Sequence, residues 1–218
     1  MNHHGFQKMM RVFIVAAIVG CFGIAIDAQT AAGDTSQTDF MGVVVGQKYT
    51  NEYFGFDFLI PSEFTILDSA EATMYSNVGA AGIKSDSNKT KQIDLAMTKQ
   101  ATFILVFEKA VGTPGNAGLE IVVIKQAAGV TAKMALTASV ALATSSPRFK
   151  LTKSLPATFG GQRFAGARID GQVGDVKIRQ ELYVIIRRGY SVHMAITYQT
   201  EDSRKNMMKM MNSLKFTV

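Results

Sequence analysis

The sequence predicts an α+β fold in which a largely antiparallel β-sheet is covered by helices. Three observations carry this prediction. Apolar residues alternate over 176–198 on both sides of a tight connection, which is typical of an antiparallel hairpin. Two nearly unbroken apolar runs within 102–124 are typical of central strands covered on both faces. The segments 131–144 and 200–214 instead repeat their apolar residues with a helical period.

The N-terminal residues 1–28 are typical of a secretory signal peptide. Lys8 and Arg11 precede an apolar run over 12–26, and Ala28 is a small residue suited to cleavage. The run of about fifteen residues is shorter than the about twenty that a membrane-spanning helix needs. We therefore expect an exported protein, periplasmic or extracellular, in which the small and polar residues 29–47 form a flexible leader.

Cys21 opens an alternative for the N-terminus. Residues 18–21 resemble a bacterial lipoprotein cleavage box, which would leave the protein anchored to a membrane by a lipid on Cys21. The apolar run ahead of Cys21 is only about eight residues long, and it continues past the cysteine to Ile26. This favours cleavage near Ala28, after which the mature chain has no cysteine.

Residues 48–218 are predicted to form a single domain. Its first strand, 54–60, is stopped by Pro61 and places alternate apolar residues on one face: Phe54, Phe56, Phe58 and Ile60. A short strand over 64–67 follows. The small and polar residues 79–91 have no apolar period and predict a mobile loop.

The middle of the chain alternates between sheet and helix. The strands 102–108 and 119–124 are joined by a turn rich in glycine. A helix over 131–144 is predicted to begin at the N-cap Thr131. Its buried face is predicted to hold Met134, Thr137, Ala138, Ala141 and Leu142.

The C-terminal part contains two further strands, the hairpin and a final helix. Strands over 149–155 and 163–170 are separated by Pro156 and a Gly160-Gly161 turn. The hairpin strand 176–186 is predicted to be half-buried, with one charged face. The final helix is predicted to start at the N-cap Thr200 and to bury Met207, Met210, Met211 and Leu214.

Several of these segments resemble the PsbP/DcrB-like superfamily. Residues 48–61 contain a tyrosine, a Gly-Phe pair and a strand-ending proline like those of its opening strand, and 181–192 and 211–216 are similar to its last hairpin and closing helix. The superfamily often has a tryptophan soon after the proline, where this chain has Phe64. The resemblance implies an α/β/α sandwich and an exported, non-catalytic accessory protein or lipoprotein, with no catalytic residues to transfer.

The sequence offers few groups for catalysis. Outside the signal region the only histidine is His193, which we expect to be partly covered in the sheet. The chain has neither a Gly-x-Ser-x-Gly nucleophile motif nor a phosphate-binding loop. We therefore predict no catalytic residue, no metal site and no cofactor. Paired carboxylates that converge from distant positions remain open.

The remaining candidate site is basic. Lys177, Arg179 and Arg187 share one strand face, and Arg163 lies on the preceding strand, so these four residues are candidates for binding an anionic partner. The simpler alternative is a solvated sheet face. The formal net charge of +6 is too small to indicate nucleic-acid binding by an exported protein.

These observations predict a non-enzymatic extracytoplasmic accessory or interaction module with an unidentified protein or envelope partner. The alternative is a protein that binds a small hydrophobic or anionic ligand in a cleft between the sheet and a helix.

Overall fold

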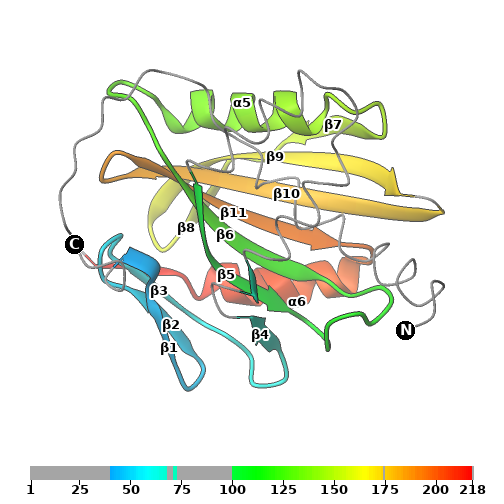
Figure 1. Cartoon of the computed structure of the whole chain (residues 1–218), viewed down its shortest axis with the longest axis horizontal. Helices are drawn as coiled ribbons and strands as arrows, with labels where there is room; N and C mark the ends of the chain where they lie inside the picture. Colours follow the sequence, from blue (N-terminus) through cyan, green and yellow to red (C-terminus); the bar gives the residue numbers. More distant parts are fainter. Residues whose placement is uncertain (1–39, 68–70, 73–99, 174, 218) are drawn as a thin grey trace.

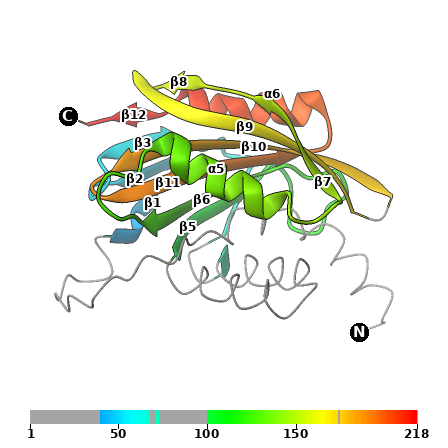
Figure 2. The same ribbon diagram turned by 90° about the horizontal axis from the view of Figure 1, so that it is seen from above.

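The structure is a computed structural model that describes residues 40–67, 71–72, 100–173 and 175–217. The predicted signal peptide (1–28), most of the predicted leader (29–47) and the predicted loop 79–91 lie outside the described residues. A twisted antiparallel sheet runs through the middle of the molecule, with helix α5 (Ala132–Ala143) on one face and helix α6 (Glu201–Asn212) on the other (Figures 1 and 2).

The described residues form two sheets, and all the strand pairs among them are antiparallel. The larger has the strand order β4-β5-β6-β11-β10-β9-β7, with β8 also paired to β9. The smaller has the order β1-β2-β3-β12. The bounds of the larger sheet are β4 (Thr65–Leu67), β5 (Gln100–Phe107), β6 (Gly118–Lys125), β7 (Phe149–Ser154), β8 (Ala157–Phe159), β9 (Gln162–Val173), β10 (Val176–Arg187) and β11 (Tyr190–Tyr198); those of the smaller are β1 (Val43–Val45), β2 (Lys48–Asn51), β3 (Phe56–Leu59) and β12 (Lys215–Phe216). The predicted α+β fold is confirmed.

The hairpin of β10 and β11 forms as predicted. Arg187 pairs with Tyr190 across a two-residue turn in which both Arg188 (φ 50°) and Gly189 (φ 78°) have positive φ. Such values at both positions match the right-handed twist of the two strands. The prediction that β10 is half-buried was wrong, because every residue over 180–185 is buried.

The two faces of β10 are covered by different layers. Arg179 lies opposite Tyr198, and Arg187 lies opposite Tyr190. The charged side chains of β10 and the apolar side chains of β11 therefore lie on the same face of the sheet. The large core that includes the methionines of α6 lies on this face, and a second core with residues of α5 lies on the other. The methionine helix and the charged residues therefore share one side of the sheet.

Helix α6 begins and packs as predicted. The Thr200 hydroxyl accepts a hydrogen bond of 3.2 Å from the Ser203 N–H, and Glu201 and Asp202 follow in the first turn, where carboxylates stabilise the helix dipole. The predicted apolar positions are all buried: Met207, Met210, Met211 and Leu214.

Helix α5 has the predicted N-cap but a different buried face. Thr131 caps it by accepting from the Met134 N–H at 3.2 Å. The predicted face was wrong: Met134 is 54% exposed, and the residues buried against the sheet are Ala135, Leu136, Ser139 and Ala143. Alanines occupy both sides of this helix, so the apolar period alone could not fix which side faces the sheet.

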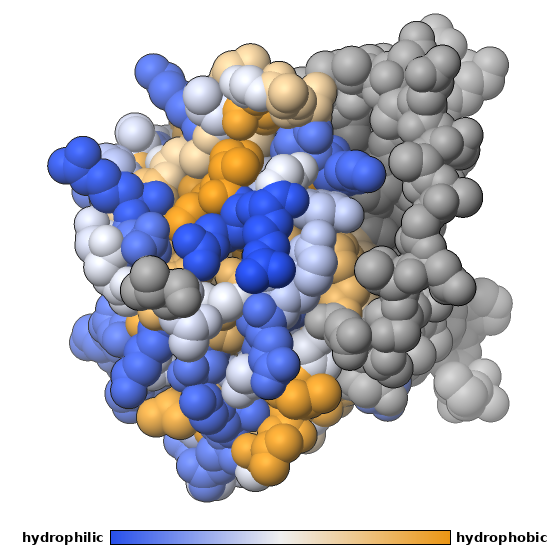
Figure 3. All heavy atoms as spheres, turned by 90° about the vertical axis from the view of Figure 1, so that its left-hand side faces the viewer, coloured by the Kyte–Doolittle hydropathy of each residue, from blue (hydrophilic) through white to orange (hydrophobic). Residues whose placement is uncertain are grey.

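The domain was predicted to start near Lys48, but its described part starts earlier in the chain. Phe40 and Met41 pack against the large core, and the Tyr49 hydroxyl donates a hydrogen bond of 2.7 Å to the Met41 carbonyl. The strand β1 pairs with β2, but Val43 (57%) and Val45 (74%) remain exposed. Figure 3 views the end of the molecule where β1 to β3 lie, and hydrophobic surface interrupts the hydrophilic residues at its lower edge.

Candidate functional site

A buried carboxylate lies at the centre of the sheet face that α6 covers. Glu181 is fully buried and accepts hydrogen bonds from the side chains of four residues. Its Oε1 accepts from Arg168 Nη2 at 2.7 Å and Nε at 3.2 Å, from Arg204 Nε at 2.8 Å and from Tyr198 Oη at 3.0 Å. Its Oε2 accepts from Tyr183 Oη at 2.8 Å.

These contacts hold Glu181 ionised. Burial raises its pKa, but the hydrogen bonds from Arg204, Arg168 and Tyr183 outweigh burial and lower the pKa to about 2. The donors come from β9, β10, β11 and α6, so the carboxylate ties four elements together. Both oxygens already accept strong hydrogen bonds, and no part of the carboxylate is exposed, so we assign Glu181 a structural role.

The four residues of the predicted basic patch do not converge. Arg179 and Arg187 are eight positions apart on β10, about 26 Å at the usual rise per residue. Arg179 forms an exposed ion pair of 2.8 Å with Glu201. Arg187 donates to the Phe54 carbonyl at 3.2 Å and lies 5.1 Å from the ring centre of Phe216. Arg163 lies on the opposite face of the sheet, because it is an odd number of residues from Arg168.

The structure instead brings Lys177 and Arg179 together with cations from two neighbouring strands. In register, Lys150 of β7 lies beside Asp170 of β9 and then Arg179 of β10. Two pairs further along the same strands, Lys153, Arg168 and Glu181 lie side by side in the same way. We call this set the basic surface: Lys150, Lys153, Arg168, Lys177 and Arg179.

Three lysines carry the free charge of the basic surface. Lys150, Lys153 and Lys177 are exposed, and none of them forms an ion pair with another described residue. Lys150 and Lys153 were not predicted as binding residues, because the sequence does not reveal the strand order that places β7 beside β9. Asp170 is the one acidic residue beside them on these strands that is not fully buried.

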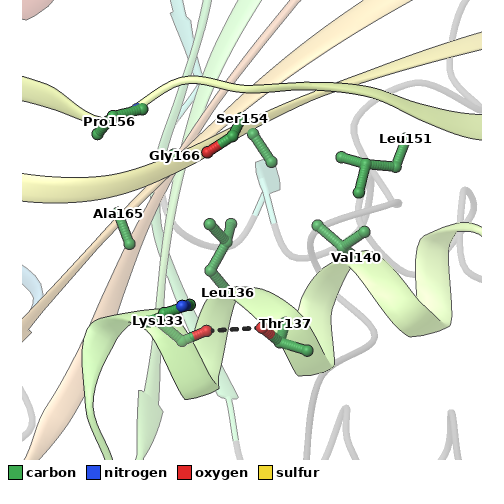
Figure 4. Close-up of a pocket in the computed structure, with 10 residues that line it drawn as sticks. Lys133, Leu136, Thr137, Val140, Leu151, Ser154, Pro156, Ala165 and Gly166 are labelled. Carbon is green, nitrogen blue, oxygen red and sulfur yellow. Dashed lines mark hydrogen bonds between the residues drawn. The ribbon is translucent and has the colours of Figure 1, made fainter.

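A second feature is an apolar groove of about 330 Å³ on the other face of the sheet, between α5 and the strands β7 and β9. Its size is at the lower end of the range of small-molecule sites. Leu136 and Val140 project from α5 toward the strands, where Leu151 faces Val140 (Figure 4). The described residues that line the groove are Lys133, Leu136, Thr137, Val140, Leu151, Ser154, Pro156, Ala165, Gly166 and Ala167.

The groove exists because β9 directs two small side chains toward α5 where the helix crosses it. Ala165 and Ala167 leave space there that larger side chains would fill. Gly166 is also needed for the chain path, because the carbonyl oxygen of Leu155 occupies the place of a Cβ on Gly166. Leu155 N donates to the Gly166 carbonyl at 2.7 Å, and the chain then turns from β7 into β8.

Replacing Gly166 by Ala is expected to lower the free energy of unfolding by about 2 kcal/mol, because the added methyl forces apart two backbone segments. Urea unfolding followed by circular dichroism measures this loss. A loss below about 0.5 kcal/mol, the range of ordinary surface substitutions, would contradict the close approach of the two strands.

His193 is fully buried under α5, whereas partial cover was predicted. Its Nε2 lies 2.8 Å from Ser191 Oγ, and its Nδ1 lies 3.3 Å from Ser139 Oγ. Because the Ser139 hydroxyl donates to the Ala135 carbonyl, it is free to accept from Nδ1–H. Burial lowers the pKa of His193 to about 3, so the ring is neutral.

Neither a metal cluster nor a membrane-spanning helix occurs in the part of the chain that the structure describes. No three His, Cys, Asp or Glu side chains there could hold a metal ion together. None of the described helices has the length and apolar character to cross a bilayer.

The sheet with α5 on one face and α6 on the other defines an α/β/α sandwich, and a known structure has a similar fold. Cyanobacterial PsbP (CyanoP) from Synechocystis sp. PCC 6803 has a TM-score of 0.50 at 14% identity, covering 81% of this chain and 96% of that chain. This likeness shows that the chain has a PsbP-like fold.

Two other structures are less similar. LpqN, involved in cell envelope biogenesis of Mycobacterium tuberculosis, has a TM-score of 0.44 at 10% identity, over 75% of this chain and 83% of that chain. A protein from Bacteroides thetaiotaomicron has a TM-score of 0.43 at 13% identity. The match covers 79% of this chain and about half (49%) of that protein's length. No family model and no curated protein matches the chain.

Proposed function

We propose that the protein is a non-enzymatic, exported accessory module that docks an anionic partner on the basic surface. The observation that carries the proposal is the group of three exposed lysines, Lys150, Lys153 and Lys177, whose charges no described residue neutralises. Clustered cations of this kind favour encounter with a partner of opposite charge and select against partners of like charge.

The surroundings of the titratable groups support a binding role over catalysis. Glu181 and His193 have the strongly lowered pKa values, and both are buried with their polar atoms bonded inside the protein. Substrate would reach neither group. Among the described residues, Lys133 is the only titratable side chain that lines the α5 groove.

Charge reversal tests the docking surface. Immobilised protein with Lys150, Lys153 and Lys177 all changed to Glu is compared with wild type in captures from an envelope fraction. The control changes Lys109, Lys125 and Lys215, three exposed lysines outside the basic surface, to Glu, so the net charge changes equally in both variants. A protein captured by wild type and the control but not by the first variant supports the proposal. Equal capture by both variants overturns it.

Export is part of the proposal and rests on the predicted signal peptide. We expect the protein recovered from the extracytoplasmic fraction to begin at Gln29, which intact-mass spectrometry measures directly. A lipid-modified chain that begins at Cys21 would establish the anchored alternative. An unprocessed chain found inside the cell would contradict export.

The α5 groove favours a second candidate function, the binding of a small apolar or anionic ligand. Its floor is apolar and Lys133 supplies one cation at its rim. A thermal-shift panel of straight-chain fatty acids and alcohols tests this function. Stabilisation by fatty acids that disappears in Ala165→Leu, which fills the groove, would support it.

A further inference from the structure

The basic surface and the α5 groove meet at one strand, β7. Lys150 and Lys153 project from it toward the α6 side, whereas Leu151 and Ser154 line the groove on the α5 side. Among the described residues β7 is the last strand on its side of the larger sheet. Every residue from Lys150 to Ser154 is exposed. The strand therefore offers three things to a partner at once: a free edge, a basic face and an apolar groove.

The hydrogen bonds at the two ends of β7 establish which backbone groups face outward. The Arg148 carbonyl accepts from Gln172 N, and Leu155 N donates to the Gly166 carbonyl, so both residues direct these groups toward β9. Backbone groups of an antiparallel strand alternate between its two sides, with one irregularity here between Leu151 and Lys153. Leu151 and Ser154 thus direct their N–H and C=O groups away from β9, toward the open side.

The charges on β7 indicate what kind of strand can pair there. A second copy of β7 would bring the lysines of the two copies close together, and like charges on paired strands are destabilising. An acidic strand would place its carboxylates beside Lys150 and Lys153. The Asp170 carboxylate lies one strand further in, beside Lys150, and attenuates the positive charge without cancelling that of Lys153.

The groove indicates the residues on the other face of such a strand. A strand added outside β7 lies about 4.8 Å from it, and its side chains alternate between the two faces. Those directed to the α5 side meet Leu151, which is 54% exposed and faces Val140 across the groove (Figure 4). Apolar side chains at these positions would cover Leu151 and reach the groove.

We propose that β7 binds an extended segment of the anionic partner as an additional strand of the sheet. The segment alternates acidic residues, which lie against Lys150 and Lys153, with apolar residues, which cover Leu151 and enter the α5 groove. This inference rests on the proposed function and specifies how the partner docks: the backbone supplies affinity and the alternation supplies selectivity.

A designed peptide tests the inference. The probe is a fluorescein-labelled octapeptide of alternating Glu and Val, and its control has the same composition with four Glu followed by four Val. Fluorescence anisotropy at about 0.1 M salt measures binding, and amide shifts in a two-dimensional NMR spectrum locate it. We expect the alternating peptide to bind at least about tenfold more tightly than the block peptide and to shift the amides of β7.

Three variants separate the parts of the proposed site. Leu151→Pro removes an outward N–H that the fold does not use, and the variant should fold because proline is tolerated on edge strands. We expect it to bind the alternating peptide at least about tenfold more weakly. Ala165→Leu, which fills the groove, and the double change of Lys150 and Lys153 to Glu should each weaken binding similarly. Ala141→Leu, on the exposed side of α5, is the matched control and should bind as wild type. The NMR spectrum shows whether each variant is folded.

The possible results distinguish the inference from the function on which it rests. Equal binding of both peptides, unchanged in Leu151→Pro but lost on charge reversal, would overturn strand addition and leave anionic docking intact. A fatty acid that binds the groove and displaces no peptide from β7, with peptide binding unaffected by Ala165→Leu, would overturn the groove's role in strand binding. Absence of binding by either peptide, together with equal envelope capture by both lysine variants, would overturn both proposals.

Discussion

Replacing Glu181 by Gln is expected to lower the free energy of unfolding by about 3 kcal/mol, within the range found when one partner of a buried ion pair is removed. The amide oxygen still accepts hydrogen bonds, but an NH₂ in the place of Oε1 meets the donors from Arg168, Arg204 and Tyr198, and an NH₂ in the place of Oε2 meets the Tyr183 hydroxyl. Two arginines, whose side chains are only 23% and 27% exposed, then lose their counter-charge. Urea unfolding at pH 7 measures the loss.

Glu201 provides the matched control for this change. It forms an ion pair of the same length, 2.8 Å, with Arg179, but its side chain is 51% exposed. The same Glu→Gln change at this position should cost less than about 1 kcal/mol, because exposed ion pairs contribute little. Equal losses in the two variants would contradict the special role of burial. Tyr198→Phe removes one donor to Glu181 and should cost about 1 kcal/mol, which keeps the test informative if the Glu181→Gln variant does not fold.

The loss of stability at low pH provides an independent check on the role of Glu181. Its pKa is about 2 in the folded protein, below the ordinary value of 4.5. The carboxylate therefore stabilises the fold fully above about pH 4.5, and this stabilisation is lost as the pH falls from 4.5 toward 2. The wild type should lose more stability than the Glu181→Gln variant over that window.

Much of the fold could be predicted from the sequence because the controlling interactions are local. Alternation over 176–198 with a positive-φ turn at Gly189 is sufficient for a hairpin, and Thr131 and Thr200 cap the helices that follow them. The spacing of the methionines in α6 predicted its buried face because polar residues occupy the rest of that helix.

The burial of β10 could not be predicted because it depends on contacts between distant segments. Lys177, Arg179, Glu181 and Arg187 read as a charged, solvated face, yet Glu181 is fully buried. Its cationic partners are 13 and 23 residues away in the chain, on β9 and α6. Without the strand register and the position of α6, no spacing in the sequence indicates that these charges meet.

The candidate site was only partly predictable for the same reason. Lys177 and Arg179 were predicted as binding residues. The lysines that complete the basic surface lie on β7, which pairs with β9 although a proline and the short strand β8 separate the two strands in the chain. The groove results from the small side chains of Ala165 and Ala167 lying under α5, which is a property of packing between elements. The alternation of Lys150, Leu151 and Lys153 is visible in the sequence, but its position at a sheet edge is not.

A His193→Gln variant is expected to lose about 2 kcal/mol less stability than the wild type when the pH falls from 6.5 to 4.5. Burial lowers the pKa of His193 to about 3 in the folded protein, from an ordinary value of 6.5. Between these two values the unfolded chain binds a proton that the folded protein does not, so stability decreases as the pH decreases. Each pH unit inside this window costs about 1.4 kcal/mol for one proton.

The pH window separates His193 from the other buried groups. Glu181 contributes only below about pH 4.5, so unfolding measured between pH 6.5 and 4.5 reports mainly on the histidine. Glu120 lies on the same face of β6, two pairs along from Val122, which is opposite His193, and it is present in both proteins. Gln can replace the hydrogen bonds to Ser139 and Ser191 without titrating, so the two proteins should have similar stability at pH 8 and diverge on acidification. Parallel stability curves over this window would show that His193 takes up its proton as readily in the folded protein as in the unfolded chain, and the assignment of a ring kept neutral between two serines would then be wrong.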